Sequence, residues 1–374
     1  MAPACNPLGW CLVKITFFGL TLSSSWGNGH ATPYRAILRA LHRLGHRITF
    51  YERDVPYYAR HRDFDHCEYC TLKLYPSWEW VRAQALAEAA HSDVVITASY
   101  VPEGAKIAEE LLALARPLRV YYDLDTPVTL QGLRNGGVEY VRARQLREFD
   151  LVLSWTAGKA LKSLVRDYGV RLARPLFGCV DPDVYRPVHP RRAWRSELSY
   201  MGTYAPDRQA KLEAMFLEPA RRRPNSPFLL AGSLYPQECY WPANVRRVEH
   251  VSPEDHPMLY SSSRLTLNLT RETMAACGYC PSGRFFEAAA CGTAIVTDSF
   301  EGLEEFFTPG EELLVAGGMQ DVLRAMRSTD SELLLMALRA RQRTLDEHTG
   351  TQRAQTLLEA FEAACRPEGS EVVA

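Results

Sequence analysis

The chain has 374 residues, of which 47% are hydrophobic and 23% charged, with a formal net charge of −1. This length exceeds what one hydrophobic core usually fills, so we expect two domains of roughly 150 to 200 residues each. The balanced charge gives no electrostatic reason to expect a nucleic-acid partner, and no apolar run reaches the roughly 18 residues that a membrane-spanning helix needs.

The ten cysteines include two Cys-x-x-Cys pairs, Cys67/Cys70 and Cys277/Cys280. The two pairs lie too far apart in the chain for the usual spacing of zinc ligands. A bound metal and a disulfide remain alternatives, but ordinary reduced cysteines are the simplest interpretation and indicate the cytoplasm. Lys14 interrupts the apolar segment 11–22, which we therefore interpret as a first core strand and not as a signal peptide.

Apolar runs typical of strands alternate with helical patterns through the first half of the chain. The first helical pattern has Thr32 as its expected cap, Pro33 at its first position and Gly45 as its stop. Alternation of this kind predicts a parallel sheet with crossover helices. The expected strands are Val13–Leu20, Arg47–Tyr51, Asp93–Ala98, Leu118–Asp123 and Leu151–Ser154.

A proline-rich stretch, residues 177–195, interrupts this pattern and predicts an interdomain linker. The alternation then restarts, which predicts a second doubly wound domain. The fold class is therefore α/β, with one domain over residues 1–185 and another over residues 186–351. The expected strands of the second domain are Leu198–Gly202, Phe228–Ala231, Leu265–Leu269, Thr293–Thr297 and Glu312–Val315.

The loop after the first strand contains Gly27, Gly29 and His30 and opens a helix. Ligands of open α/β sheets bind beyond the carboxyl ends of strands, and glycines there let the backbone approach a sugar or an anion. A neutral His30 imidazole in this place can remove a proton from an acceptor hydroxyl. The alternative is that His30 only caps the helix.

Asp123 and Asp125 stand at the end of the fourth expected strand, before Pro127. Because they alternate, at most one of them faces the same side as His30. Either can orient His30 or hold an acceptor hydroxyl, and either can instead cap the turn before the proline. Two carboxylates without a third ligand do not indicate a metal site.

The second half repeats the arrangement of strand, small-residue loop and helix. Gly202 follows one strand and allows close backbone approach, and Arg208 can neutralise a phosphate or pair with a surface carboxylate. Gly232 ends the next strand and can offer backbone contacts to a base.

A third loop leads into a helix with Ser282 as its expected cap, Arg284 in its first turn and Gly292 after its end. Helix N-termini bind anions, so we expect a diphosphate here. Glu287, one turn further, can accept two vicinal ribose hydroxyls, or it can be a buried acid paired with Arg284 or another local donor. After the following strand, Glu301 and Gly302 are placed to meet polar groups of a sugar.

These motifs resemble glycosyltransferases of the GT-B fold, most of all the group called spore maturation protein CgeB-like. The resemblance rests on Tyr200-Met-Gly-Thr-Tyr-Ala-Pro-Asp-Arg208, on the segments 265–269 and 282–292, and on Glu301-Gly-Leu-Glu-Glu-Phe306. Gly29-His-Ala-Thr-Pro33 is similar to the opening of many GT-B enzymes, in which the histidine is the general base of inverting members.

The resemblance implies two facing Rossmann-like domains with a deep cleft between them, and a final helix, residues 352–365, that packs back on the first domain. It implies that the C-terminal domain binds a nucleotide-sugar donor and the N-terminal domain an acceptor. Retaining members carry an acid eight residues before the ribose-binding one, and here that position is Tyr279. This departure favours inversion.

The resulting hypothesis is a cytoplasmic, metal-independent glycosyltransferase of the hexosyltransferase type (EC 2.4) that needs no cofactor besides its nucleoside diphosphate sugar. The acceptor, a small molecule, a glycan or a protein, stays unidentified. A nucleotide-sugar epimerase and a non-catalytic carbohydrate-binding protein are the alternatives on the same fold.

Overall fold

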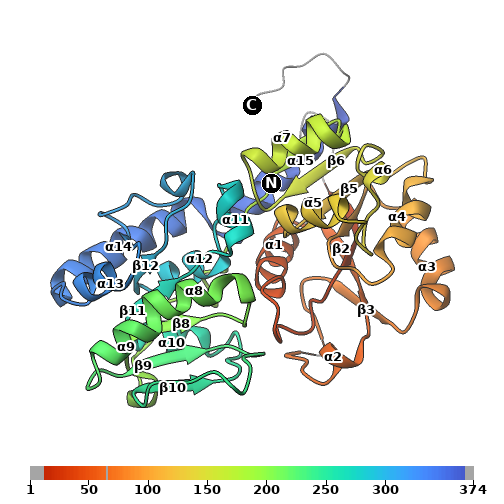
Figure 1. The fold of residues 1–374 in the computed structure, drawn as a ribbon. Coiled ribbons are helices and arrows are strands. Elements are labelled where there is room, and N and C mark those ends of the chain that lie inside the picture. Colours follow the sequence, from red (N-terminus) through yellow and green to blue (C-terminus); the bar gives the residue numbers. More distant parts are fainter. Residues whose placement is uncertain (1–11, 65, 367–374) are drawn as a thin grey trace. The chain divides into compact units, whose positions relative to one another are not determined.

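The computed structural model describes residues 12–64 and 66–366, and this part of the chain divides into two compact units (Figure 1). The first unit comprises the described parts of Met1–Ser24, Ile37–Phe177 and Gly350–Ala374. The second comprises Ser25–Ala36 and Gly178–Thr349, so the loop with His30 groups with the second unit.

The first unit is built on a seven-stranded parallel sheet in the order β3-β2-β1-β4-β5-β6-β7. Its strands are β1 (Lys14–Gly19), β2 (Arg47–Arg53), β3 (Thr71–Tyr75), β4 (Val94–Ala98), β5 (Leu118–Asp123), β6 (Leu151–Ser154) and β7 (Ala173–Pro175). Its helices are α1 (Ala31–Arg43, which begins in the second unit), α2 (Pro56–Ala59), α3 (Trp78–Ala90), α4 (Gly104–Leu112), α5 (Thr126–Arg134), α6 (Ala143–Leu146), α7 (Lys159–Tyr168) and α15 (Gly350–Cys365).

The second unit is built on a six-stranded parallel sheet in the order β10-β9-β8-β11-β12-β13. Its strands are β8 (Ser196–Met201), β9 (Phe228–Ala231), β10 (Val245–Val248), β11 (Ser263–Asn268), β12 (Ala294–Thr297) and β13 (Leu314–Val315). Its helices are η1 (Arg192–Trp194), η2 (Pro206–Arg208), α8 (Gln209–Leu212), η3 (Glu213–Leu217), α9 (Glu218–Arg222), α10 (His256–Ser261), α11 (Glu272–Cys277), α12 (Gly283–Ala290), η4 (Leu303–Glu305), α13 (Met319–Ala325) and α14 (Asp330–Glu347).

Both sheets have the strand order of a doubly wound fold, so the predicted fold class is confirmed. In each unit the first strand lies inside the sheet. The next two strands in sequence lie on one side of it, and the remaining strands lie on the other side. Each sheet is buried by a core of its own. Tyr121, Phe149 and Val152 belong to a core of the first unit, and Phe216 and Phe228 belong to that of the second.

The start of the first predicted helix differs from the structure, whereas its end agrees. Helix α1 begins at Ala31 and not after Thr32, and its first backbone bond runs from Tyr34 N–H to the His30 carbonyl over 3.2 Å. The prediction of Thr32 as the cap is therefore wrong, and His30 takes that position. Gly45 follows the helix with φ +93°, as expected of the glycine that ends a helix.

The proline-rich stretch 177–195 contains the short helix η1 (Arg192–Trp194) and an isolated bridge at Val180, but no longer helix or strand. Val180 pairs with Thr349 as an isolated parallel bridge, and Val180 N–H donates to the His348 carbonyl over 3.1 Å. Beyond Thr349 the chain continues as α15, which packs against β5 and β6 in the first unit and buries Leu357 and Phe361.

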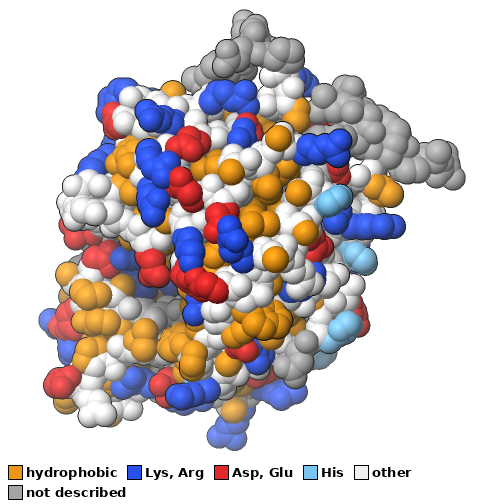
Figure 2. Space-filling model, turned by 90° about the vertical axis from the view of Figure 1, so that its right-hand side faces the viewer, with side chains coloured by type: hydrophobic (Ala, Val, Ile, Leu, Met, Phe, Trp, Pro, Cys, Tyr) orange, Lys and Arg blue, Asp and Glu red, His pale blue; other side chains and the backbone are white. Residues whose placement is uncertain are grey.

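The exterior of the first unit carries charges of both signs. Figure 2 shows a face on which Lys and Arg side chains alternate with Asp and Glu among hydrophobic ones. Within residues 12–64 and 66–366, no helix combines the length and the apolar character that crossing a membrane requires.

Candidate functional site

Gly202 and Gly232 directly follow the carboxyl ends of β8 and β9 in the second unit, and they lie against each other. A Cβ at Gly232 would lie 2.0 Å from the Gly202 carbonyl oxygen, and a Cβ at Gly202 would lie 2.6 Å from Arg284 Nη1. Both distances are below van der Waals contact, so a side chain at position 232 would collide with backbone, and one at position 202 would displace the end of the Arg284 side chain. Tyr235 donates its hydroxyl to the Gly202 carbonyl over 3.0 Å and fixes the first loop from the other side.

Arg208 ends the short helix η2 that follows this loop, and it is only 9% exposed. It donates to the Thr203 carbonyl, but its Nε is buried without a hydrogen-bond partner among the described residues. No carboxylate of the described residues makes an ion pair with it. The alternative of a surface ion pair for Arg208 is therefore wrong, and a buried guanidinium without a counter-charge favours an anionic ligand.

Arg284 lies in the first turn of α12, and Ser282 occupies the N-cap position as predicted, although its side chain makes no capping bond. Arg284 donates to the Met201 carbonyl over 2.8 Å and to the Leu269 carbonyl over 3.2 Å. Its Nε is also buried without a partner among the described residues. Gly292, with φ +72°, follows the end of the helix as expected.

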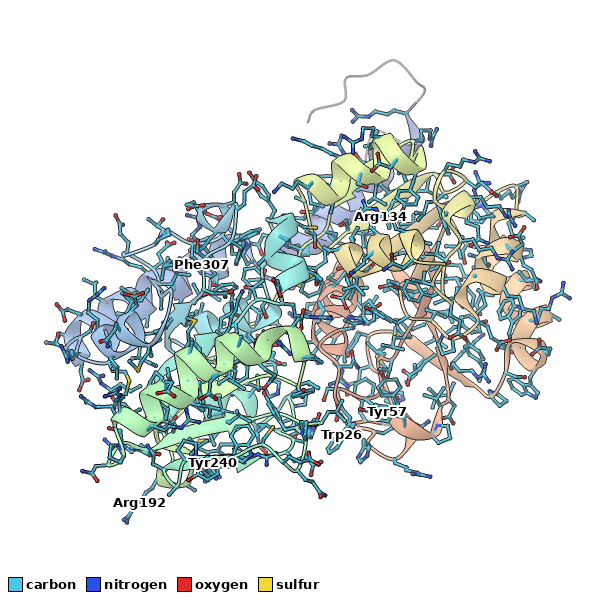
Figure 3. The ribbon with its side chains drawn as sticks, in the orientation of Figure 1. Trp26, Tyr57, Arg134, Arg192, Tyr240 and Phe307 are labelled. Atoms are coloured by element: carbon cyan, nitrogen blue, oxygen red, sulfur yellow. The ribbon has the colours of Figure 1, made fainter. Side chains whose placement is uncertain are left out.

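The opposite face of α12 packs on an aromatic cluster. The rings of Phe285 and Phe286 lie 5.8 and 6.1 Å from that of Phe307, which is labelled in Figure 3. The His348 ring lies 4.6 Å from that of Phe286. This packing fixes the direction in which the N-terminus of α12 points.

The electrostatic surroundings of Arg208 are positive. Burial lowers the pKa of its guanidinium, and the nearby charges of Arg284 and Arg271 lower it further. Arg271 is paired with Asp207, at 3.3 Å, whereas Arg208 and Arg284 make their side-chain bonds to neutral carbonyl groups. The excess of positive charge, together with the helix N-terminus, suits a phosphate group.

Glu287 is a buried acid, 6% exposed, on the same helix as Arg284. Its Oε2 accepts from the Tyr260 hydroxyl over 3.3 Å and lies 3.6 Å from His256 Nδ1. Glu287 is therefore a buried acid held by a donor other than Arg284, which is one form of the expected alternative. His256 in turn contacts the Tyr185 hydroxyl at 3.1 Å, and the nearby Glu287 carboxylate contributes to raising the pKa of Tyr185, after the larger effect of burial.

The loops at residues 278–279 and 301–302 pack closely against each other. Gly302 has φ +83°, and a Cβ there would lie 2.4 Å from the Tyr279 ring. Tyr279 has the left-handed φ of +48°, which is costly for an aromatic residue, and its N–H donates to the Glu301 carbonyl over 2.6 Å. The Glu301 side chain itself is exposed.

Segment 25–30 groups with the second unit, and the structure fixes its shape locally. Gly27 has φ +62°, whereas a Cβ at Gly29 would meet nothing within 4 Å. His30 is half-buried, and its N–H donates to Asn28 Oδ1 over 2.7 Å. The ring of Trp26, labelled in Figure 3, lies 4.4 Å from that of His250 and is tilted by 44° to it.

A buried carboxylate holds the stretch that leads into this segment. Glu52, 1% exposed, accepts from Leu22 N–H at 2.6 Å and from Ser23 N–H at 2.9 Å. It also accepts from the hydroxyls of Thr21 and Ser23. The backbone before the segment 25–30 is therefore anchored to β2.

Asp123 and Asp125 lie in the first unit, whereas His30 groups with the second. Asp123 Oδ1 accepts from Asp125 N–H and from the Thr129 hydroxyl, so this carboxyl group holds the turn into α5. Asp125 takes the N-cap position of α5 without a side-chain capping bond, and its Oδ2 accepts from the Tyr100 hydroxyl over 3.0 Å. Burial raises the pKa of Asp123 to about 7.

Sequence reasoning assigned no role to three residues around these loops. The Arg284 guanidinium lies 5.7 Å from the centre of the Tyr200 ring, and Tyr260 and His256 contact Glu287. His256 and Tyr260 are spaced by four residues on α10, which places them on one face of that helix. That spacing is common in core helices, so it does not by itself indicate a site.

Known proteins support the same fold. A family model described as glycosyl transferase-like matches residues 208–359. No curated protein matches the sequence. Three solved structures illustrate the structural likeness, each 13% identical to this chain.

A sucrose-phosphate synthase from Thermosynechococcus elongatus aligns with a TM-score of 0.68 over 94% of this chain and 98% of its own. HepE from Anabaena, in complex with UDP and glucose, aligns with a TM-score of 0.66 over 94% of this chain and 100% of its own. An alpha-glucosyltransferase in complex with UDP and DNA aligns with a TM-score of 0.69 over 95% and 100%. At these identities the likeness establishes the fold, which is that of the GT-B glycosyltransferases.

Proposed function

We propose that the protein is a glycosyltransferase that moves a sugar from a nucleoside diphosphate donor to an acceptor hydroxyl or amine. The observation that carries the proposal is the pair of guanidinium groups of the buried Arg208 and the half-buried Arg284, neither of which is paired with a carboxylate among the described residues, beside the tight turn at Gly202. The match of residues 208–359 to a glycosyl transferase-like family supports it. Similarity to the CgeB-like group is part of the same proposal.

In this proposal the donor binds to the second unit. Arg208, Arg284 and the N–H groups after Ser282 stabilise the diphosphate that departs, because this is where negative charge increases in the transition state. Glu287 accepts the ribose hydroxyls, oriented by Tyr260 and His256. Gly232 offers backbone groups to the base, and Glu301 with Gly302 contacts the sugar. UDP is the nucleotide we propose, since two of the structures similar to this chain contain it.

The chemical step in this proposal depends on His30, with Gly27 and Gly29 shaping its loop. His30 removes the proton of the acceptor, and Asp123 or Asp125 assists by orienting the imidazole or the acceptor hydroxyl. Tyr279 stands where a retaining enzyme would carry an acid, which favours inversion. The proposed reaction needs no metal and no further cofactor, and the acceptor is a small molecule, a glycan or a protein rather than a nucleic acid.

A thermal-shift titration with UDP tests the donor site. We expect UDP to raise the melting temperature of the unaltered protein, because a ligand of the native state stabilises it by mass action. Arg284→Ala should abolish most of this shift, and Arg208→Lys, which keeps the charge but loses the planar fork, should reduce it. The exposed Arg324→Ala should leave it unchanged and serves as the matched control.

Measuring the UDP-induced thermal shift and sugar transfer on the same variant distinguishes the proposed catalytic role of His30 from donor binding. His30→Ala should keep the UDP shift and lower sugar transfer by on the order of a hundredfold. No stabilisation by UDP or by a panel of other nucleoside diphosphates would overturn the donor site. If the sugar of the donor is isomerised in the absence of an acceptor, the protein is an epimerase and not a transferase. If the donor binds but no turnover occurs, the protein is a binding protein.

A further inference from the structure

Two thiol groups of the first unit face each other just before β3. Cys70 Sγ lies 3.1 Å from Cys67 Sγ and donates its S–H to it. The two residues are not joined by a disulfide. Cys67 is 7% exposed, whereas Cys70 is half-buried. The two sulfur atoms are thus already in contact, within a Cys-x-x-Cys spacing that a disulfide can close.

The two sulfur atoms have different surroundings. Cys67 Sγ accepts a hydrogen bond from the Cys70 thiol and also bonds to the backbone of Tyr69 and Cys70, and these bonds lower its pKa to about 6 although burial opposes them. The pKa of Cys70 is raised by its bond to Cys67, by burial and by the charge of Glu52. The bond between the two sulfur atoms thus favours the thiolate form of Cys67 and the thiol form of Cys70, the arrangement found in redox-active dithiols.

The second Cys-x-x-Cys pair of the chain is the natural comparison. Cys277 and Cys280 have the same spacing, but the two residues between them, Gly278 and Tyr279, both have left-handed φ angles of 75° and 48°. Burial raises the pKa of Cys280 to about 12, with smaller contributions from Asp298 and Cys277. The two pairs thus share their spacing, but the backbone between the cysteines is left-handed in the second pair and burial raises the pKa of its Cys280.

We propose that Cys67 and Cys70 form a redox-reactive site that a hydroperoxide converts reversibly into a disulfide. The Cys67 thiolate attacks one peroxide oxygen, the O–O bond breaks, and Cys67 becomes a sulfenic acid while hydroxide departs. The Cys70 thiol gives its proton to that hydroxide, and its sulfur attacks Cys67 Sγ and displaces a second hydroxide. With one proton from solvent, two thiols and one hydrogen peroxide yield one disulfide and two waters.

The exposure of the two cysteines determines which oxidant can reach them and how the disulfide can be reduced. Only a small molecule such as hydrogen peroxide suits a sulfur that is 7% exposed, and the half-buried Cys70 gives a reductant its point of attack. A dithiol such as dithiothreitol then restores both thiols by thiol–disulfide exchange and leaves as its own cyclic disulfide. This site does not depend on the proposed donor site, so its test does not require transferase activity.

Mass spectrometry of the full chain after brief treatment with equimolar hydrogen peroxide tests the proposal. After alkylation of the remaining thiols and digestion, we expect residues 67–70 to have lost two hydrogens and to be protected from alkylation, and dithiothreitol to reverse both. Cys291, which is 2% exposed and whose thiol pKa is raised by burial, should stay fully alkylated and serves as the internal control. Oxidation of Cys291 to the same extent, or full alkylation of Cys67 and Cys70, would overturn the site.

Two variants separate the two steps. Cys70→Ser removes the resolving thiol, so Cys67 should accumulate as a sulfenic acid that dimedone traps. Cys280→Ser should leave the oxidation of the first pair unchanged. Dimedone labelling at Cys277 in place of Cys67 would contradict the assignment, and the unaltered protein gives an answer even where a variant folds poorly.

Discussion

Asp123 is a carboxyl group that is 1% exposed at the carboxyl end of β5. Its Oδ1 accepts two hydrogen bonds, from Asp125 N–H at 3.1 Å and from the Thr129 hydroxyl at 3.0 Å. Burial outweighs these bonds and raises its pKa from 3.8 to about 7, and the charge of Asp125 adds to the rise. The folded protein therefore holds a proton here that the unfolded chain releases near pH 4.

We expect Asp123→Asn to be more stable than the unaltered protein at pH 8 and of similar stability at pH 4. A raised folded pKa gives a contribution that is fully present below the unfolded pKa and is lost as the pH rises through about 7. Asparagine keeps the accepting oxygen and does not titrate. The difference in unfolding free energy should grow with pH to on the order of 3 kcal/mol, measured by urea denaturation at a series of pH values.

The exposed Glu254→Gln is the control for this series and should show no such growth. A difference for Asp123→Asn that shrinks as the pH rises would mean that the carboxylate is stabilised in the fold, against the burial described above.

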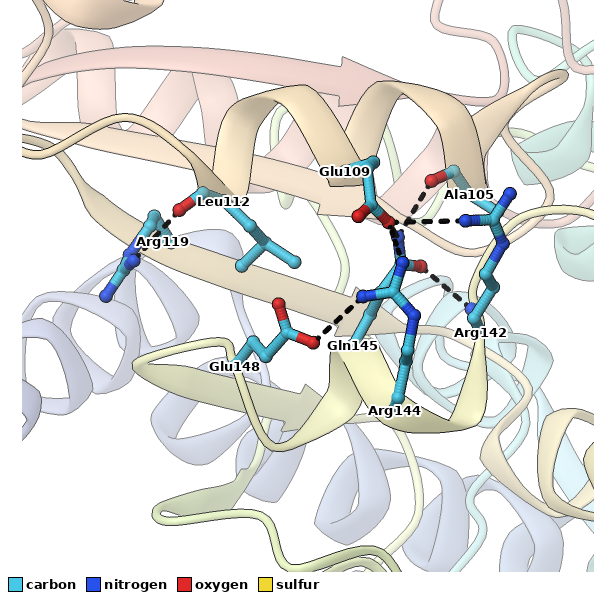
Figure 4. Close-up of polar contacts among 8 residues, drawn as sticks. All are labelled: Ala105, Glu109, Leu112, Arg119, Arg142, Arg144, Gln145 and Glu148. Atoms are coloured by element: carbon cyan, nitrogen blue, oxygen red, sulfur yellow. Dashed lines mark hydrogen bonds and ion pairs between the residues drawn. The ribbon is translucent and has the colours of Figure 1, made fainter.

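Helix α6 has only four residues, and one buried side chain attaches it to α4. Gln145, fully buried, donates to the Ala105 carbonyl and to Glu109, each over 2.9 Å, and its oxygen accepts from Arg142 N–H over 2.9 Å (Figure 4). Arg144 joins the same network through exposed ion pairs with Glu109 and Glu148. The buried bonds should matter more, because water competes poorly for them.

Gln145→Leu should lower the unfolding free energy by about 1 to 3 kcal/mol, because it leaves the Arg142 N–H without its partner and removes the buried bonds to the Ala105 carbonyl and to Glu109. Arg144→Ala should change it by no more than about 0.5 kcal/mol. Chemical denaturation of both variants at one pH gives the comparison. An equal loss in both would assign the attachment to the ion pairs instead.

The three strands that the sequence did not predict were missed for the same physical reason. Strands β3, β7 and β10 all lie at the edge of a sheet, and none is a continuous apolar run. Thr71–Tyr75 alternates polar and apolar residues, Ala173–Pro175 ends in proline, and Val245–Val248 has two exposed arginines at its centre. Central strands are buried on both faces and give a strong apolar signal, whereas edge strands do not.

The candidate site divides in a similar way. Residues whose role depends on local backbone could be predicted, such as Ser282, Arg284 and Gly292, since caps and turns leave a mark in neighbouring sequence. The partners of Glu287 could not, because Tyr260 and His256 come from another helix. A contact between distant segments is fixed by packing, which a single sequence does not display.

The chain as a whole consists of two units with separate cores, and its last helix completes the first. Phe361 of α15 is fully buried in the first unit, and Phe216 is fully buried in the second. Each ring fills space in one core only, so each should report on the stability of its own unit.

We expect Phe361→Ala to cost the first unit about 3 to 5 kcal/mol and to leave amide protection in β11 and β12 of the second unit largely intact. Phe216→Ala should do the reverse and spare β5 and β6. Hydrogen exchange resolved by peptide measures both. Equal loss of protection in both units from either variant would mean that they unfold as one cooperative body.

The bridge between Val180 and Thr349 also has a consequence for rearranging the gene. The backbone leaves the first unit and returns to it at neighbouring positions, so residues 181–348 form an excursion whose two ends are already paired. A segment whose two ends lie close together can be cut out or moved, because a short linker is enough to join the two chain ends that remain. The segment is therefore a natural module for grafting between proteins of this architecture, provided that residues 25–36 accompany it.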